Sequence, residues 1–316
     1  MIHTINYRSI NDMNQTILRN LHKFPHDIDL VVGIPRSGML PANLIALYLQ
    51  KPYTDIDSFI NGKIYESGER GQHFKTDRLK KILIVDDSIC SGKALNKTKQ
   101  KLTDHPQKDN FSILFAAVFA TEESQNKVDI FCEIVPWPRV FQWNIFHHIS
   151  FIPQSFCDID GVLCPNPPID DDGEQYINYI KNAPQLYIPS IEIDTIISCR
   201  LEKYRDITET WLKEKNIKYK HLILLNKPNK EARKKWGKHG EYKGHLYKKS
   251  ECTLFIESSL WEAKIIQKIS NKPVFCTETF EMLNTSATKQ RFFQNLECIK
   301  VFIWKILCFL HIMKKT

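Results

Sequence analysis

Residues 82–95 read Ile-Leu-Ile-Val-Asp-Asp-Ser-Ile-Cys-Ser-Gly-Lys-Ala-Leu, and this stretch decides the fold prediction. Four apolar residues end at the adjacent carboxylates Asp86 and Asp87, and a Ser/Cys/Gly loop leads into a helix-compatible run from Lys93. A buried strand that feeds a helix N-terminus favours phosphate binding, because unpaired N–H groups and the helix dipole attract an anion. The carboxylates are expected at the strand's C-terminal end, where open α/β sheets bind ligands. A turn with a solvated acid pair is the alternative.

Similar apolar runs alternate with helical stretches along the N-terminal part of the chain. One of them, Val31-Val32-Gly33-Ile34, ends in the turn Pro35-Arg36-Ser37-Gly38. The sequence predicts strands at 29–34, 82–86, 111–119 and 128–135, and helices near 39–50 and 92–104. Strands that alternate with helices predict a parallel sheet.

The segment from Val85 to Gly92 resembles the phosphoribosyl-pyrophosphate (PRPP) motif of type I phosphoribosyltransferases. The resemblance implies that Asp86 and Asp87 contact the ribose hydroxyls of PRPP. It also implies that the following loop holds the 5-phosphate, and this loop consists of Ser88, Ile89, Cys90, Ser91 and Gly92. The family commonly has two threonines where this chain has Cys90 and Ser91, so one hydroxyl is kept and one is replaced by a weaker donor.

The turn with Arg36, Ser37 and Gly38 resembles the first loop of the same family, which holds the pyrophosphate. The resemblance further implies a Mg²⁺ cofactor that bridges the pyrophosphate and the ribose hydroxyls, a nucleobase-like small-molecule acceptor, and a possible homodimer. Between the two motifs, a glycine-rich stretch carries cations that could screen the leaving pyrophosphate, namely Lys63, Arg70, His73 and Lys75. A solvated surface hairpin is the alternative for this stretch.

A second motif begins near Ser155 and reads Phe-Cys-Asp-Ile-Asp-Gly-Val-Leu-Cys over residues 156–164. On an extended strand end, carboxylates two residues apart point to one side, and Gly161 lets the chain turn sharply. The stretch resembles motif I of haloacid dehalogenase (HAD)-like phosphohydrolases. That resemblance implies that Asp158 is the nucleophile and Asp160 the general acid/base, with Mg²⁺ held by the first carboxylate and a backbone carbonyl.

The remaining HAD-like motifs are matched more weakly. Ser198, after Thr195-Ile196-Ile197, is the candidate for the phosphoryl-binding hydroxyl, and Lys243 is the candidate for the motif lysine, with Lys248 and Lys249 as rivals. Glu257 ends the apolar run from Thr253, and Ser258 stands where the family has a second acid. The implied metal ligands are Asp158, Asp160 and Glu257.

The composition of the chain limits the class of protein to which these motifs can belong. The 316 residues suggest two domains, and the net charge of +8 suits anionic substrates while tolerating nucleic acid or an acidic membrane surface. The nine cysteines include no Cys-x-x-Cys and predict reduced thiols in a cytoplasmic protein. The apolar run 301–313 is too short and too charged to span a bilayer. We expect 289–316 to be a docked helix, with an interfacial membrane anchor as the alternative.

The sequence therefore predicts an α/β protein with two doubly wound domains. We expect a phosphoribosyltransferase-like parallel sheet over 1–138, an aromatic linker helix over 139–152, a HAD-like Rossmannoid sheet over 153–276, and a basic, apolar helical extension over 277–316. The expected function is PRPP-dependent transfer coupled to a phosphatase that acts on the product. The alternatives are a PRPP- or nucleotide-binding regulator with an impaired HAD-like domain, and a nucleic-acid- or membrane-linked effector that uses the basic region 227–249.

Overall fold

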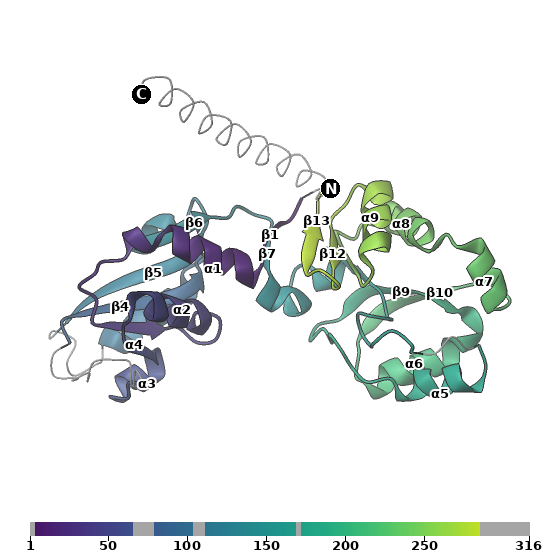
Figure 1. Cartoon of the computed structure of the whole chain (residues 1–316), viewed down its shortest axis with the longest axis horizontal. Helices are drawn as coiled ribbons and strands as arrows, with labels where there is room; N and C mark the ends of the chain where they lie inside the picture. Colours follow the sequence, from purple (N-terminus) through teal and green to yellow (C-terminus); the bar gives the residue numbers. More distant parts are fainter. Residues whose placement is uncertain (1–3, 66–78, 104–110, 169–171, 285–316) are drawn as a thin grey trace, which may run out of the picture. The chain divides into compact units, whose positions relative to one another are not determined.

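The computed structural model describes residues 4–65, 79–103, 111–168 and 172–284 (Figure 1). Contacts divide the chain into two compact units. The first unit is Asn6–Trp143, and the second is Asn144–Thr316 together with Met1–Ile5. Each unit is built around a sheet of its own, and each is described by itself below.

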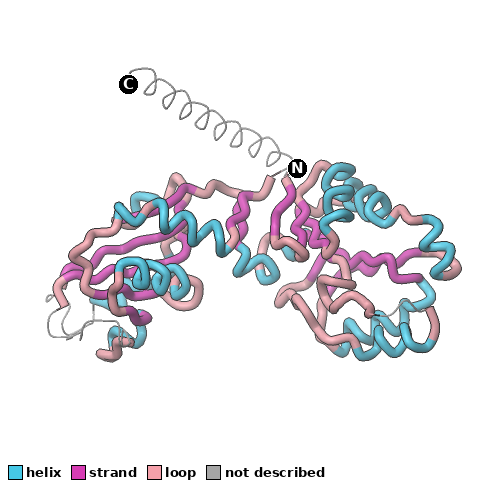
Figure 2. Tube along the Cα trace, viewed as in Figure 1, coloured by secondary structure: helices cyan, strands magenta, loops and turns pink. Residues whose placement is uncertain are grey.

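The first unit contains a five-stranded sheet in the order β3-β2-β4-β5-β6, and all its neighbouring strands are parallel. Figure 2 shows the strands in magenta and the helices in cyan. Its strands are β2 Leu30–Gly33, β3 Tyr53–Asp55, β4 Lys81–Ser88, β5 Ser112–Ala120 and β6 Ile130–Ile134. Its helices are α1 Ile10–Arg19, α2 Met39–Leu49, α3 Ile56–Ile60 and α4 Lys93–Thr103. The predicted α/β fold with a parallel sheet is confirmed for this unit.

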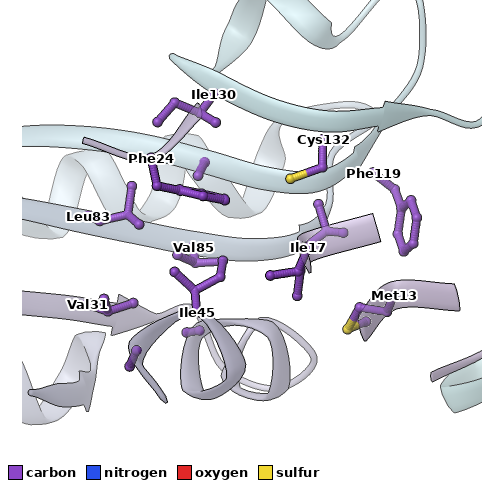
Figure 3. Packing of buried hydrophobic residues seen from close by; sticks show 14 of the residues in the cluster. Met13, Ile17, Phe24, Val31, Ile45, Leu83, Val85, Phe119, Ile130 and Cys132 are labelled. Carbon is purple, nitrogen blue, oxygen red and sulfur yellow. The ribbon is translucent and has the colours of Figure 1, made fainter. Parts of the chain in front are cut away.

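The central strand β4 is covered on both faces, which explains its continuous apolar run. Leu83 and Val85 belong to the cluster that α1 and α2 complete with Ile17 and Ile45 (Figure 3). Their neighbours in the strand alternate to the opposite face, where a second cluster includes Ile82, Ile84, Phe59 and Leu102. Both clusters fix β4, so the end of this strand is held rigidly.

The second unit contains a six-stranded sheet in the order β10-β9-β8-β11-β12-β13, in which only β13 is antiparallel to its neighbour. Its strands are β8 Ser155–Cys157, β9 Ile193–Leu201, β10 Tyr219–Leu225, β11 Leu254–Glu257, β12 Val274–Cys276 and β13 Glu281–Leu283. Its helices are α5 Glu174–Asn182, α6 Arg205–Glu214, α7 Lys230–Trp236, α8 His239–Lys249 and α9 Leu260–Ser270. The chain leaves β8 in one direction and returns on its other side at β11, and such a switch point opens a crevice for ligands.

The predicted linker helix over 139–152 is wrong. Arg139–Phe141 forms strand β7, which pairs in parallel with β1 Asn6–Arg8, and short 3₁₀ turns follow at Gln142–His147 and Ile152–Gln154. The side chains of β7 are buried, and its partner strand lies at the other end of the unit's sequence. No local sequence pattern can therefore predict the pairing.

The expected boundary after residue 138 also shifts, because the first unit continues to Trp143. Residues 1–5 group with the second unit rather than the first. There, the N–H of Ile5 donates to Asn284 Oδ1 at 2.9 Å, and Asn284 Nδ2 donates back to the Ile5 carbonyl at 2.8 Å. This reciprocal amide pair ties the start of the described chain to its end.

The predicted helical extension over 277–316 is wrong in its described part, since Glu281–Leu283 is strand β13 and pairs with β12. This pairing supplies the backbone hydrogen bonds that a helix would otherwise have to make. The segment 289–316 lies outside the described residues. Among the helices that the structure describes, none has the length and apolar character needed to cross a bilayer.

Leu83 tests the role of β4 in the first unit. It is fully buried, so Leu83→Ala should destabilise the unit by about 2–5 kcal/mol through lost burial and a residual cavity. Leu47→Ala is the matched control, because this leucine is 65% exposed. Native-state hydrogen exchange at the β4 amides measures both variants. Equal protection in the two variants would contradict the assignment of β4 to the core.

Candidate functional sites

The turn before α2 packs against the end of β4, and Gly38 makes this possible. A Cβ atom at Gly38 would lie 2.6 Å from the carbonyl oxygen of Ile34 and 2.7 Å from that of Val85, both backbone atoms. Any other residue would push the turn away from the strand. Gly38 therefore brings the exposed Arg36 and the half-buried Ser37 to the carboxyl end of the sheet.

Asp87 is buried, and its carboxylate is held by two donors from distant parts of the chain. Ser37 Oγ donates to Oδ1 at 2.8 Å, and Trp143 Nε1 donates to Oδ2 at 2.7 Å. The strand continues to Ser88 instead of ending at Asp86, so the two acids occupy successive positions of one strand. Asp87 therefore faces protein donors, and the two carboxylates do not form the equivalent pair that the sequence predicts.

Asp86 lies beside this anchored carboxylate, and its Oδ1 accepts the N–H of Asp87 at 2.9 Å. Burial, together with the neighbouring charge of Asp87, raises the pKa of Asp86 to about 8. Asp86 therefore keeps its proton up to about pH 8, because the surrounding protein does not stabilise a second negative charge at the end of β4. Hydroxyl donors or a cation on a ligand would favour the ionised carboxylate.

The predicted phosphate loop is held through its carbonyl groups. The Ile89 carbonyl accepts Arg139 Nη2 at 2.9 Å and Ser124 Oγ at 2.9 Å. Lys127 Nζ donates to the carbonyls of Cys90 and Ser91, at 3.2 Å each. Three cationic or hydroxyl donors thereby fix the orientation of three successive peptide groups.

The amide groups of the same loop are left available. Among the described residues, the N–H groups of Cys90, Ser91 and Gly92 have no hydrogen-bond acceptor. The Gly92 carbonyl accepts the N–H of Asn96, so α4 starts directly after these amides. Successive free amides at a helix N-terminus form a concave site for an anion.

Sequence reasoning missed four residues of this site, namely Ser124, Lys127, Arg139 and Trp143. For Arg139 and Trp143, the only sequence signal is the aromatic stretch for which a linker helix is predicted. The guanidinium of Arg139 lies near the rings of Trp137 and Phe141, and burial lowers the pKa of Arg139. Of the predicted screening cations, Lys63 is exposed, and the other three, Arg70, His73 and Lys75, lie outside the described residues.

The second unit holds a cavity of about 880 Å³ at the carboxyl ends of β8, β9 and β11. Five of the predicted residues line it, so the structure brings them to one site: Asp158, Asp160, Ser198, Lys243 and Glu257. Ser198 is buried within β9 and does not end the strand. The rivals Lys248 and Lys249 are exposed at the end of α8.

Lys243 is buried, and its ammonium contacts three carboxylates. Its Nζ lies 2.8 Å from Asp158 Oδ2, 2.8 Å from Glu257 Oε2 and 2.9 Å from Glu262 Oε2. Burial and the charge of Glu257 raise the pKa of Asp158 well above its usual range. Burial alone would raise the pKa of Glu262, but hydrogen bonding to His239 and the charge of Lys243 outweigh it and lower the pKa to about 2. No sequence motif indicated Glu262.

Asp160 is held apart from this cluster by Arg200. Arg200 Nε and Nη2 donate to the Asp160 carboxylate at 3.0 and 2.6 Å. The Asp160 carbonyl accepts Ser258 Oγ at 2.9 Å. The close approach requires Gly161, which has a φ of +80° and where a Cβ atom would lie 2.4 Å from Ser258 Cβ. Both oxygen-bearing groups of Asp160 therefore already have protein partners.

The predicted metal ligands Asp158, Asp160 and Glu257 do not fit a preformed Mg²⁺ centre. Asp160 is paired with Arg200, and the ammonium of Lys243 contacts both of the other carboxylates. The second oxygen of Glu257 accepts the N–H of Ser258 at 2.8 Å. In the described part of the chain, no three His, Cys, Asp or Glu side chains form a group that could hold a metal ion.

The basic region 227–249 is not one exposed patch. Lys230 and Lys243 are buried, and Lys227 Nζ lies over the ring of Trp236 at 5.2 Å from its centroid. The remaining cations are distributed over two short helices, α7 and α8. This arrangement does not favour the nucleic-acid effector alternative.

Comparison with known proteins identifies the class of the first unit. Residues 2–147 match the family model of the phosphoribosyl transferase domain. The match includes both motifs of the first unit, and it supports the resemblance to phosphoribosyltransferases for this part of the chain. The match ends at residue 147, and the HAD-like domain stays a prediction. No curated protein matches the chain.

Several solved structures resemble the chain. The xanthine-guanine-hypoxanthine phosphoribosyltransferase of Helicobacter pylori is 20% identical, with 45% of this chain and 94% of that chain covered and a TM-score of 0.33. A purine phosphoribosyltransferase from Pyrococcus horikoshii is 22% identical, with 46% and 96% covered and a TM-score of 0.33. The orotate phosphoribosyltransferase of Aeropyrum pernix is 14% identical, with 39% and 69% covered and a TM-score of 0.28.

The raised pKa of Asp86 predicts a pH-dependent stability. Between the usual value of 3.8 and about 8, the folded state keeps a proton that the unfolded state has lost. The free energy of unfolding should therefore fall as pH rises through this window. Asp86→Asn should remove this fall, whereas Glu122→Gln, at an exposed acid, should keep it. Urea unfolding between pH 5 and 8.5 measures the slopes, and equal slopes in both variants would refute the prediction.

Proposed function

We propose that the first unit transfers phosphoribose from PRPP to a nucleobase-like acceptor. The observation that carries this proposal is the gathering of three groups at one edge of a parallel sheet. These groups are the acid pair at the end of β4, the turn with Arg36, and the free amides before α4. In open α/β sheets, this edge is where ligands bind.

The proposed reaction displaces pyrophosphate from the ribose C1 atom by a nitrogen nucleophile of the acceptor. The C1–O bond breaks with its electron pair going to pyrophosphate, and a C1–N bond forms. The free amides at 90–92 would bind the 5-phosphate, and Asp86, beside the protein-anchored Asp87, would accept hydrogen bonds from the ribose hydroxyls. The cation of Arg36 would offset the charge of the leaving group.

A Mg²⁺ ion would enter with PRPP and supply additional positive charge at the pyrophosphate. Burial and the neighbouring charge of Asp87 raise the pKa of Asp86, and a cation that arrives with the ligand would favour its ionised form. The protein contributes position and electrostatics, because the reaction asks no covalent step of its side chains.

Pyrophosphate release tests the proposed transfer. Wild type, incubated with PRPP, Mg²⁺ and a panel of purine and pyrimidine bases, should release pyrophosphate with at least one base. Asp86→Asn should lower kcat/KM by about a hundredfold, because it weakens a preorganised electrostatic contact with the ribose. Absence of both pyrophosphate release with every base and PRPP binding by calorimetry would remove the proposal.

The contacts of Lys127 with the phosphate loop give a second, more specific expectation. Lys127→Met should raise the KM for PRPP about tenfold with little effect on the acceptor KM, because the cation holds the carbonyls of the phosphate loop. Lys97→Met is the matched control, since this exposed lysine of α4 lies outside the site. Steady-state kinetics with each substrate varied separately measures both. A change in the acceptor KM alone would contradict this role of Lys127.

For the second unit, we propose that the cavity binds a phosphate ester without hydrolysing it, as in the regulatory alternative. Two observations support binding over the predicted phosphatase chemistry. The pairing of Asp160 with Arg200 engages the expected acid/base, and the ammonium of Lys243, 2.8 Å from Asp158 Oδ2, engages an oxygen of the expected nucleophile. The role of a homodimer and the cytoplasmic location stay predictions.

Hydrolysis of p-nitrophenyl phosphate tests this second proposal. With Mg²⁺ present, wild type and Asp158→Asn should show the same background rate. The comparison controls for contaminating phosphatase, because both proteins are purified in the same way. Turnover in wild type that disappears in Asp158→Asn would instead support the phosphatase.

A further inference from the structure

Two arginines that line the cavity of the second unit keep buried N–H groups without an acceptor. Arg200 is only 1% exposed, and its Nη1 has no hydrogen-bond partner. Arg233, on α7, donates from Nη1 to the Cys199 carbonyl at 3.1 Å, while its Nε is buried and has no partner. Both side chains approach the end of β9, since Cys199 and Arg200 are adjacent in that strand.

Such groups indicate a missing acceptor. Buried polar atoms in folded proteins are nearly always hydrogen-bonded, and a buried guanidinium N–H without a partner is costly. Arg200 uses Nε and Nη2 for Asp160, and this leaves the remaining side of its planar guanidinium free. Guanidinium groups bind the oxygens of phosphate and carboxylate through paired hydrogen bonds.

The distribution of charge places the anion on the arginine side of the cavity. Lys243 contacts three carboxylates with one ammonium, so that side already carries excess negative charge. The charge of Arg200 is balanced by Asp160. Within the described residues, Arg233 has no carboxylate partner.

We propose that Arg200 and Arg233 receive the oxyanion of the bound phosphate ester, and that this binding requires no divalent cation. The inference rests on the proposed binding function of the second unit and assigns the residues that recognise the ligand. The ligand's phosphorus would then lie on the arginine side of the cavity and not against Asp158. This arrangement differs from the one that the sequence motif implies, in which Asp158 attacks phosphorus and Mg²⁺ neutralises the charge.

Calorimetry with phenyl phosphate as the probe tests the assignment in the full chain, with EDTA present. Wild type should bind, and Arg233→Met should weaken binding at least tenfold. Arg200→Lys should also weaken binding, because it keeps the charge that faces Asp160 but removes the planar fork. Arg205→Met is the matched control, since this arginine of α6 pairs with Glu202 and Glu209 and does not line the cavity.

Hydrogen exchange assigns the binding to this cavity rather than to the first unit. Phenyl phosphate should protect amides of β9 and α7 in wild type, and Arg233→Met should lose this protection while keeping the exchange pattern of the free protein elsewhere. Binding that appears only after Mg²⁺ is added, or that is unchanged in Arg233→Met, overturns the inference alone. No binding with or without Mg²⁺ overturns the proposed ligand-binding function of the unit itself.

Discussion

The buried carboxylate of Asp87 is the interaction on which the first site depends. A buried negative charge must be matched by donors, and here the donors come from Ser37 and Trp143, which are 50 and 56 residues away in the sequence. One carboxylate therefore joins the turn before α2, the end of β4 and the segment after β7. Because Asp87 is anchored in this way, burial together with the charge of Asp87 raises the pKa of the neighbouring Asp86 to about 8.

Much of the fold could be predicted because its strands are apolar runs bounded by turn residues. Ile82–Val85 and Val31–Val32 are buried on both sides, so they show the continuous pattern of a parallel sheet. Strands β7 and β13 escaped prediction for another reason. Each has only three residues, and each exists because a partner strand supplies its hydrogen bonds, which a local pattern cannot show.

The residues of the candidate sites were likewise predictable only in part. Short motifs or the expected order of strands and helices indicated Asp86, Asp87, Asp158 and Lys243. Residues that act at a strand end often lie close together in the sequence or at the start of a predictable helix, and this makes them visible. Arg200 has no such signal, since it lies near the end of the strand β9 and reaches a carboxylate 40 residues earlier in the chain. Yet this arginine alters what Asp160 can do. A motif identifies which residues are present, and only the fold shows which of them are already engaged.

The two sites differ in how their buried charges are matched, and this difference bears on what each can bind. In the first unit, backbone amides and a side chain cation surround one charged strand end, so a phosphate and a sugar can both find partners. In the second unit, the acids outnumber the cations around Lys243, while Arg233 stands without a carboxylate partner among the described residues. An anion placed beside Asp158 would be repelled by like charge, whereas the same anion beside Arg233 would be attracted by opposite charge. The cavity is partly desolvated, so this attraction is stronger there than in water. The location of the unpaired cation, more than the sequence motif, therefore determines where an anionic ligand can be held.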